Sequence, residues 1–521
     1  MESFIQRHAD AVLGLLNGFD RLRLRGTKRL LANAGGMRSF LFQEGVLLKH
    51  FKAYALAATE RIRQATAHLA RAAGQAIRYV ACSSQSKEDL VQHIAQTEGR
   101  GAGLICILSC VEPCWSYELH RNRARKELEL QGGWRKCLHY YHYFQHAQLG
   151  RLHVRLQTWF PFAVHVCLNG RAWLACQMDA AGIGYRRRDN CFVQIADLAA
   201  AQALMDRQLR TDWPKLLDGL VAQVNPAEAE LFRRTAVPYY WSVEQSEWAS
   251  DVMFRSAAAL AALYPRLIRH GIQNLGSLDV LRFLGRKVPA HNGRYGTFKG
   301  EVVSELKERP EGLRIKHRVN RNSVKMYDKQ GSVLRIETTL NDARDMKVYR
   351  PKEGDALGPK QWRYLRKGVA DLHRRAQVSQ AANARYLASL AAVEQTQALG
   401  ALTARLCRPA EWRGQRVRAL NPLSAADAEL LAAVNRGEFT LHGFRNRDLR
   451  ARLYGPKPQD PDEARRQSAA VTRKLRMLRA HGLIQKVPTT HRYILTKRGA
   501  PAITAILAAR AADTAKLIDA A

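Results

Sequence analysis

The chain has 521 residues, of which 46% are apolar, and this composition excludes a disordered protein and predicts several folded domains. Its 83 lysine and arginine residues outnumber its 46 acidic residues, and a formal charge of +37 calls for a polyanionic partner, most simply nucleic acid. No apolar run approaches the length of a membrane span and the N-terminus lacks the features of a signal peptide, so we expect a cytoplasmic protein with no membrane partner.

The first hundred residues have a mainly helical pattern, with apolar residues three and four apart over 46–74. A short alternating basic segment at 19–27 is typical of a strand. Residues 101–198 then carry several short apolar runs, interrupted by one helical segment at 171–181. Strand, strand, helix, strand is the order of half a ferredoxin-like unit, which predicts an α+β sheet domain here.

Residues 199–300 return to a helical pattern that ends in a basic, glycine-rich loop at 285–300. Three strand-like runs within 301–350, joined by turn residues, predict an antiparallel β-meander. A basic helical linker region at 351–420 leads to a C-terminal domain at 421–521. The expected fold is therefore α+β and multidomain.

The C-terminal domain has the strongest local pattern. Ser424 can cap a first helix, 444–449 opens a second, a third covers 462–481, and 483–495 alternate as a two-stranded wing. Three helices followed by a hairpin predict a winged helix-turn-helix. The stretch LRAHGLIQKV followed by HRYILTKRG also resembles the MarR-type winged helices.

Basic and polar residues on the second and third of these helices and on the wing form the predicted recognition surface, because arginine can reach guanine edges in the major groove. Basic clusters elsewhere predict an extended track for DNA and also for structured RNA. The alternative, in which the winged helix only mediates protein contacts, stays open. The predicted nucleic-acid-binding residues are Arg186, Arg187, Arg188, Lys316, Arg318, Arg445, Arg447, Arg465, Arg466, Ser468, Arg473, Lys474, Arg476, His491 and Arg492.

A candidate catalytic pattern lies in the meander, where Tyr327, Asp328 and Glu337 fall on adjacent predicted strands. The Y-D-K and R-x-E pattern resembles the initiators of rolling-circle replication. This resemblance implies that a metal polarises the scissile phosphate and that a tyrosine attacks it. Asp328 and Glu337 would then hold Mg²⁺ or Mn²⁺, and the sequence indicates no other cofactor. The alternative pairs these carboxylates with neighbouring arginines.

The histidines and cysteines give weaker patterns. No His-hydrophobic-His triplet is present, and His139 and His142 are expected to pack in the core or on the surface. The nine cysteines form no C-x-x-C pair, so reduced core thiols are expected. The spacing of Cys110 and Cys114 could contact a metal, but no second pair is evident.

Over nearly its full length the chain resembles a large, functionally uncharacterised family of bacterial proteins, through the stretches FDRLRLRGT, LSCVEPC, RLQTWFPF, YRRRDNCF and IKHRVNRNSVKMYDKQGSVLRIETT. The resemblance implies a bacterial protein, in the setting of a mobile genetic element, and no particular activity. We therefore expect a nucleic-acid-binding protein. The alternatives are a metal-dependent DNA-nicking or strand-transfer nuclease and an RNA-guided ribonucleoprotein.

Overall fold

The computed structural model describes residues 1–82, 84–98, 102–286, 290–291, 294–295, 300–309, 312–352, 354–355, 357–391, 399–436, 439, 443–488, 490–496 and 498–512. The chain is a mixed α/β protein of two compact units. The first unit comprises residues 1–272, 283–286 and 303–391, and the second comprises 273–282, 287–302 and 392–521. No helix in the described part of the chain combines the length and the apolar character that crossing a bilayer needs.

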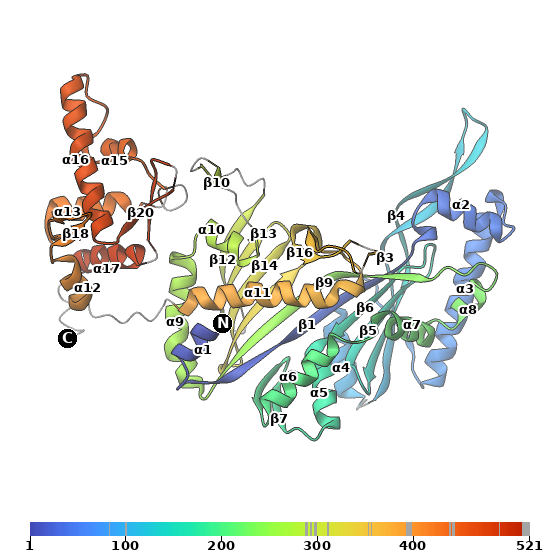
Figure 1. Ribbon diagram of the computed structural model, residues 1–521. Helices are drawn as coiled ribbons and strands as arrows, with labels where there is room; N and C mark the ends of the chain where they lie inside the picture. The colour runs from blue at the N-terminus through green and yellow to red at the C-terminus, as the bar shows by residue number, and fades with distance from the viewer. Residues whose placement is uncertain are drawn as a thin grey trace. The chain divides into compact units, whose positions relative to one another are not determined.

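An eleven-stranded sheet forms the centre of the first unit (Figure 1). Its spatial order is β12-β13-β14-β15-β9-β1-β6-β5-β4-β3-β2. The assigned strand pairs are antiparallel, apart from the parallel pair β2–β3. The strands are β1 (Val12–Lys28), β2 (Ile77–Tyr79), β3 (Gly103–Asn122), β4 (Glu127–His146), β5 (Gly150–Gln157), β6 (Val164–Asn169), β9 (Tyr239–Phe254), β12 (Val302–Arg309), β13 (Gly312–Val319), β14 (Asn322–Lys329) and β15 (Val333–Leu340).

Helices and small hairpins stand between these strands in the sequence. The helices before residue 391 are α1 (Glu2–Arg7), α2 (Ala34–Gln43), α3 (Phe51–Ala72), α4 (Lys87–Thr97), α5 (Gly170–Ala180), α6 (Leu198–Gln208), α7 (Trp213–Val224), α8 (Ala227–Leu231), α9 (Ala257–Gln273), α10 (Ser277–Phe283) and α11 (Leu372–Leu390). The hairpins are β7 (Tyr185–Arg188) with β8 (Cys191–Ile195), β10 (Ala290–His291) with β11 (Arg294–Tyr295), and β16 (Lys347–Arg350) with β17 (Gln361–Tyr364).

The two faces of the sheet differ because side chains alternate along each strand. On β1, Leu22 and Leu24 are buried on the apolar face. They share one core with residues of α2, α3, α7 and α11, and α11 lies along β9 and β15 (Figure 1). The intervening residues of β1 point to the opposite, polar face. Hydrophobic burial on one face thus fixes which side chains the other face presents.

The polar face is covered at two places. Near the start of β1, α5 and α6 pack over Leu16 in a small apolar cluster. On β3 and β4, α4 contributes Val91 and Ile94 to a cluster that contains Tyr141 and Tyr143. The part of β1 that carries Arg21 and Arg23 is exposed.

The second unit has its own core and consists mainly of helices. Ser424 accepts a hydrogen bond from the backbone N–H of Asp427 and so caps α13, as its sequence position predicts. Gly482 has φ +70 and follows α16, which is the left-handed conformation expected after a helix. The second unit contains nearly all of α10 and the β10–β11 hairpin. Its other elements are α12 (Leu399–Leu406), β18 (Ala410–Trp412), β19 (Gln415–Val417), α13 (Ala425–Val434), α15 (Asn446–Tyr454), α16 (Pro461–Ala480), β20 (Ile484–Lys486), β21 (Tyr493–Leu495) and α17 (Gly499–Ala511).

Four expectations about the chain before residue 391 need correction. The mainly helical region 1–100 contains the 17-residue strand β1, and the helical region 199–300 contains the 16-residue strand β9. The ferredoxin-like order does not form, because β3 to β6 pair consecutively and the strand after α5 belongs to the separate hairpin β7–β8. The predicted meander exists as β13–β14–β15, but it pairs with β9 and extends the main sheet.

The missed strand β9 has a physical explanation. Its polar face carries Glu244, Gln245 and Glu247, while Trp248 is buried on the other face. Polar residues in the middle of a sheet obscure the alternation that identifies a strand. The basic loop predicted at 285–300 lies largely outside the described residues.

Candidate nucleic-acid interface and carboxylate centre

One face of the sheet carries polar and basic side chains across several strands. Residues opposite each other in an antiparallel pair share a face, as do residues two apart on one strand. The registers connect Lys316, Lys325 and Glu337 across β13, β14 and β15, and they place Arg21 opposite Glu247 across β1 and β9. We call the exposed and half-buried cations of this surface the basic face: Arg21, Arg23, Arg25, Lys316, Arg318 and Lys325.

Three arginines of the basic face occupy alternate positions of β1. Arg21 and Arg23 are exposed. Arg25 is half-buried, and its Nη1 atom lies 3.6 Å from Oε1 of Glu244. Arg21 and Arg23 are therefore the members of this row most available to an anion in solution.

A polar pocket of about 450 Å³ lies where β13, β14, β15 and β9 meet. Four of its lining residues are cations and one is an acid. The cations include Lys316 and Arg318, both predicted from sequence to bind nucleic acid. The lining residues are Gln245, Glu247, Lys316, Arg318, Asn320, Arg321, Ser323, Lys325, Thr339 and Asn341.

A group of three carboxylates borders this pocket, and we call it the carboxylate centre: Asp20 on β1, Glu247 on β9 and Glu337 on β15. One carboxylate oxygen from each lies within 4.8 Å of those from the other two. The register of β1 and β9 shifts between Phe19 and Arg21, so Asp20 is the extra residue of a β-bulge. Bulges redirect side chains, and this bulge brings Asp20 to the polar face beside Arg21.

The three carboxyl groups have different surroundings. Glu337 accepts hydrogen bonds from Lys325 Nζ at 2.6 Å and from Tyr327 Oη at 2.7 Å. Burial alone would raise the pKa of Glu337, but Lys325 and Tyr327 outweigh it and lower the pKa to about 2. Burial raises the pKa of Glu247, and the charge of Glu337 adds to this effect. Burial likewise raises the pKa of Asp20.

A buried ion-pair network contacts the carboxylate centre through Asp20. Arg335 donates to both carboxylate oxygens of Asp251, at 2.6 and 2.8 Å, and to Oδ1 of Asp20 at 2.9 Å. Arg171 on α5 lies 3.0 Å from Asp251. Gly170 allows this approach, because a Cβ there would lie 2.0 Å from the backbone oxygen of Phe19. Burial alone would raise the pKa of Asp251, but its two arginines outweigh burial and lower it.

The predicted catalytic residues are only partly brought together. Tyr327 and Glu337 meet, as described. Asp328 lies opposite Leu334, one residue out of phase with Tyr327, and therefore points to the other face of the sheet. The predicted metal pair of Asp328 and Glu337 is wrong, because strand alternation separates the two carboxylates. Burial raises the pKa of Asp328 and the pKa of Tyr327, the latter well above 10.

The predicted role of the histidines in packing fits their burial. His139 and His142 are buried, and desolvation lowers the pKa of His139 to about 3 and that of His142 to about 4. Both are therefore neutral at physiological pH. His139 has a second feature, because it lies beside Cys114 and Cys137 in the described structure.

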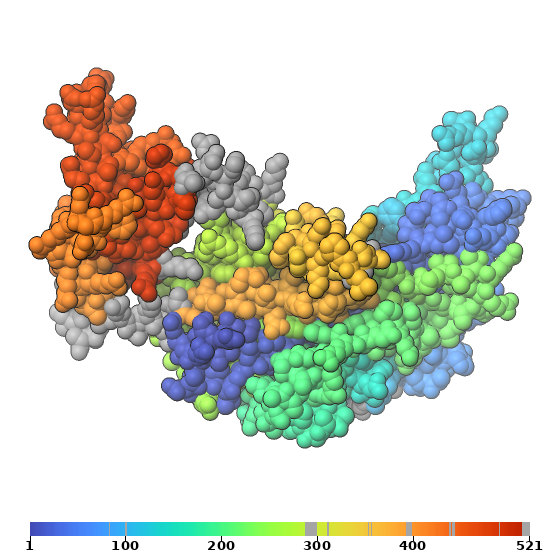
Figure 2. Space-filling model, in the orientation of Figure 1, coloured from blue at the N-terminus to red at the C-terminus, as the bar shows by residue number. Residues whose placement is uncertain are grey.

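Beyond Cys114 and Cys137 the β3–β4 hairpin continues as an arm, residues 115–134. Tyr117 and Leu130 still belong to the main core, and only the tip, residues 120–129, projects from the first unit (Figures 1 and 2). Trp115 and Trp134 face each other across its two strands, and 38% and 73% of their surfaces are exposed. The tip carries four exposed cations, Arg121, Arg123, Arg125 and Lys126. The arm thus combines aromatic and basic side chains at the surface.

The predicted cluster on β7 is split by strand alternation. Arg186 and Arg188 are exposed, whereas Arg187 folds back and donates to the backbone oxygen of Asp189 at 2.8 Å. Asp189 in turn lies 3.0 Å from Lys329. Arg186 and Arg188 are the two that can contact a ligand.

The helix α16 has apolar residues on a buried side and arginines on an exposed side, as predicted. Val471, Leu475 and Leu478 are buried, while Arg473 and Arg476 are exposed. Arg476 donates to the side-chain oxygen of Gln415 at 2.8 Å. The other predicted exposed residues of this unit are Arg447, Arg465, Arg466 and His491, and the half-buried ones are Arg445, Ser468, Lys474 and Arg492.

Several residues of the interface were not predicted from sequence. Arg21 and Arg23 stand in an alternating basic segment, and that alternation is the signal that could have identified them. Asp20 and Glu247 had no such signal, because one depends on a β-bulge and the other on an unrecognised strand. No protein-family model matches the chain, and no curated protein and no solved structure is significantly similar to it.

Proposed function

We propose that this protein binds nucleic acid through the basic face of its large sheet. The observation that carries the proposal is the polar pocket, in which Lys316, Arg318, Arg321 and Lys325 converge around a single acid, Glu247. A phosphate group matches such a pocket in charge, because lysine and arginine side chains are the usual phosphate ligands.

The surroundings of the pocket extend this surface. Arg21 and Arg23 continue the row of cations along β1. A phosphodiester backbone repeats its charge at intervals of a few ångströms, so it can contact the pocket and the arginine row together. The exposed Trp115 and Trp134 of the arm lie on the other face of their strands from Cys114, and they offer a separate stacking platform for unpaired bases.

The second unit supplies a further candidate for DNA binding. We propose that α13, α15, α16 and the β20–β21 hairpin form a winged helix-turn-helix with α16 as its recognition helix. The burial of Val471, Leu475 and Leu478 and the exposure of Arg473 and Arg476 support this assignment. A recognition helix needs this separation, since one side anchors it while the other enters the major groove.

Filter binding of duplex DNA, single-stranded DNA and structured RNA across a salt series tests the proposal. Binding through several phosphate contacts predicts a steep, linear fall of log affinity with log salt concentration. A nearly flat dependence for all three ligands would overturn it. Identifying any nucleic acid that copurifies with the full chain distinguishes DNA from RNA, including an RNA guide, as the partner.

A second candidate function is metal-dependent cleavage of the bound strand. It is favoured by the convergence of Asp20, Glu247 and Glu337 within 4.8 Å, beside the proposed phosphate pocket. Oxygen ligands of this kind suit Mg²⁺ or Mn²⁺, which would polarise a phosphate and activate a water molecule. We assign Tyr327 the role of a donor that orients Glu337, because its raised pKa opposes nucleophilic attack.

Glu247 is the residue to replace in a cleavage assay, because Glu337 and Asp20 belong to the buried network. Supercoiled plasmid incubated with Mg²⁺ or Mn²⁺ should be nicked by the wild-type chain and left intact by Glu247→Gln. Equal nicking by both proteins would exclude this centre. If binding depends steeply on salt but no metal-dependent nicking is seen, the protein binds nucleic acid without cleaving it. The carboxylates then serve only in ion pairs.

A further inference from the structure

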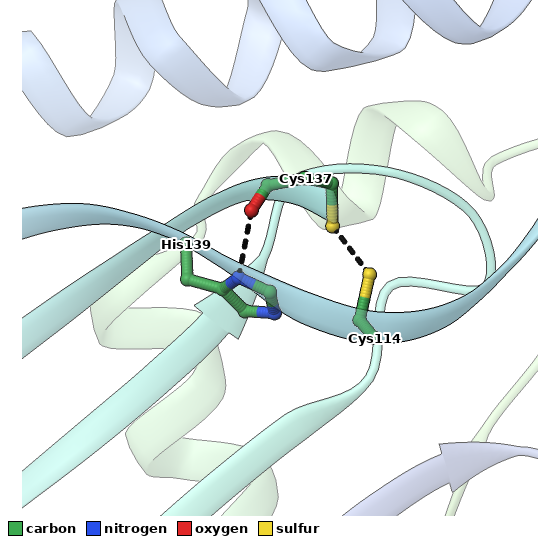
Figure 3. Close-up of side chains that lie close together, drawn as sticks. All are labelled: Cys114, Cys137 and His139. Atoms are coloured by element: carbon green, nitrogen blue, oxygen red, sulfur yellow. Dashed lines mark hydrogen bonds between the residues drawn. The ribbon is translucent and has the colours of Figure 1, made fainter. Parts of the chain in front are cut away.

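Two cysteines and a histidine converge on the polar face of β3 and β4, at the base of the arm (Figure 3). Cys114 and Cys137 are 23 residues apart in sequence, and their sulfur atoms lie 2.6 Å apart. His139 follows Cys137 by two residues and shares its face of the strand. One ligand atom from each of the three residues lies within 4.8 Å of the other two.

The imidazole of His139 is held in an orientation suited to a ligand. Its Nδ1 atom lies 3.1 Å from the backbone oxygen of Cys137. If Nδ1 carries the proton and donates it to this carbonyl, the lone pair is on Nε2. Figure 3 shows Nε2 on the side of the ring turned toward Cys114. A second-shell carbonyl that fixes the tautomer in this way is typical of metal-binding histidines.

Other buried cysteines of the chain have different surroundings. Cys110 and Cys191 are fully buried, and the sulfur of each contacts the backbone oxygen of the following residue. That arrangement is expected of a thiol that serves as a small core residue. The group at Cys114 instead combines two sulfur donors with one nitrogen donor.

We propose that Cys114, Cys137 and His139 bind one zinc ion. Sulfur and imidazole nitrogen are the donors that zinc prefers, and three protein ligands leave one position of a tetrahedral ion for water. Two thiolates and a neutral imidazole would balance the charge of the ion, and two protons leave as it binds. Zinc–sulfur bonds of about 2.3 Å place two sulfurs about 3.8 Å apart. The sulfur atoms must therefore separate by about 1 Å.

The position of the site indicates a structural role. Residues 115–134 of the arm lie beyond it on both strands. An ion bound here would join β3 to β4 at the base of the arm, next to the part that Tyr117 and Leu130 anchor in the main core. It would thereby fix the direction in which the arm presents Trp115, Trp134 and its basic tip.

Metal analysis of the full chain, purified under reducing conditions and dialysed against zinc, tests the proposal. Plasma mass spectrometry should find one zinc per chain in the wild type and in the control variant Cys110→Ser. It should find none in Cys114→Ser or His139→Asn. Cobalt added to the apo protein should give the intense visible and near-ultraviolet bands of a thiolate-bound tetrahedral ion in the wild type and in the control.

Two results would overturn the proposal. One is the absence of stoichiometric zinc and of a cobalt–thiolate band in folded wild-type protein, a measurement that does not depend on the folding of any variant. The other is a disulfide between Cys114 and Cys137, seen by mass spectrometry as a linked peptide, in protein prepared under those reducing conditions.

Discussion

Replacing Arg21 and Arg23 together by glutamine should weaken nucleic-acid binding by a predictable amount. Both side chains are exposed on the uncovered part of β1. Arg25 is left unchanged, because Glu244 at 3.6 Å already neutralises part of its charge. The double variant should remain folded, since exposed substitutions usually change stability by less than about 0.5 kcal/mol.

The magnitude follows from counterion release. Each lost phosphate contact lowers the slope of log affinity against log salt by about 0.9 for duplex DNA, so two contacts remove about 1.8. Between 50 and 200 mM salt, a fourfold change, the wild type should lose about 12-fold more affinity than the variant. For single-stranded DNA the corresponding slope change is about 1.4.

The matched control is Lys52→Gln with Arg71→Gln on α3, which covers the apolar face. It removes the same two charges from exposed positions. Fluorescence anisotropy with a labelled oligonucleotide at five or more salt concentrations measures both slopes. An unchanged slope in the β1 variant, or an equal change in the α3 control, would refute the assignment of the contact surface.

Three further variants test other parts of the account. Arg335→Met should destabilise the fold by about 3–5 kcal/mol in urea denaturation at neutral pH, because the buried carboxylates of Asp20 and Asp251 lose the guanidinium that they share and keep only the ionic interaction with Arg171. This loss should shrink at lower pH as the two carboxylates take up protons, and a loss below about 1 kcal/mol would contradict the network. Asp328→Asn should raise the melting temperature at pH 7.5. Because the pKa of Asp328 is raised in the folded protein, stability falls as pH rises through that pKa, and the gain from the variant should vanish toward pH 4. An equal gain at both pH values would argue against ionisation of Asp328 as the cause. Replacing Arg473 and Arg476 by alanine should lower affinity, with a flatter salt slope for phosphate contacts or relaxed sequence preference for base contacts; unchanged binding would make the C-terminal unit a protein-interaction module.

Local patterns predicted local structure well. Ser424 caps α13, α16 ends within a residue of each predicted bound, and a hairpin follows Gly482, as the sequence predicts. Each depends on neighbours within a few residues. The strands β13, β14 and β15 were likewise recognisable, because short turns join them.

The carboxylate centre could not be predicted because it depends on long-range pairing. Asp20 and Glu337 are more than three hundred residues apart and become neighbours only because β9 pairs with both β1 and β15. The polar residues of β9 led to its prediction as part of a helical region. The proximity of Cys114 and Cys137, which are diagonal neighbours on β3 and β4, likewise depends on strand register. Asp328 was wrongly assigned as a metal ligand beside Glu337. Because Asp328 is the next residue after Tyr327 on the same strand, its side chain points to the opposite face of the sheet.

Lysine footprinting shows whether the basic face of the sheet contacts nucleic acid. Lys316 lines the proposed phosphate pocket, and Lys52 is exposed on α3 beyond the apolar face. Acetylation of the full chain with and without saturating oligonucleotide, followed by peptide mass spectrometry, compares the two lysines in one sample. Bound nucleic acid should protect Lys316 from acetylation several-fold and leave the acetylation of Lys52 unchanged. Unaltered acetylation of Lys316 in a saturated complex would contradict the proposed contact.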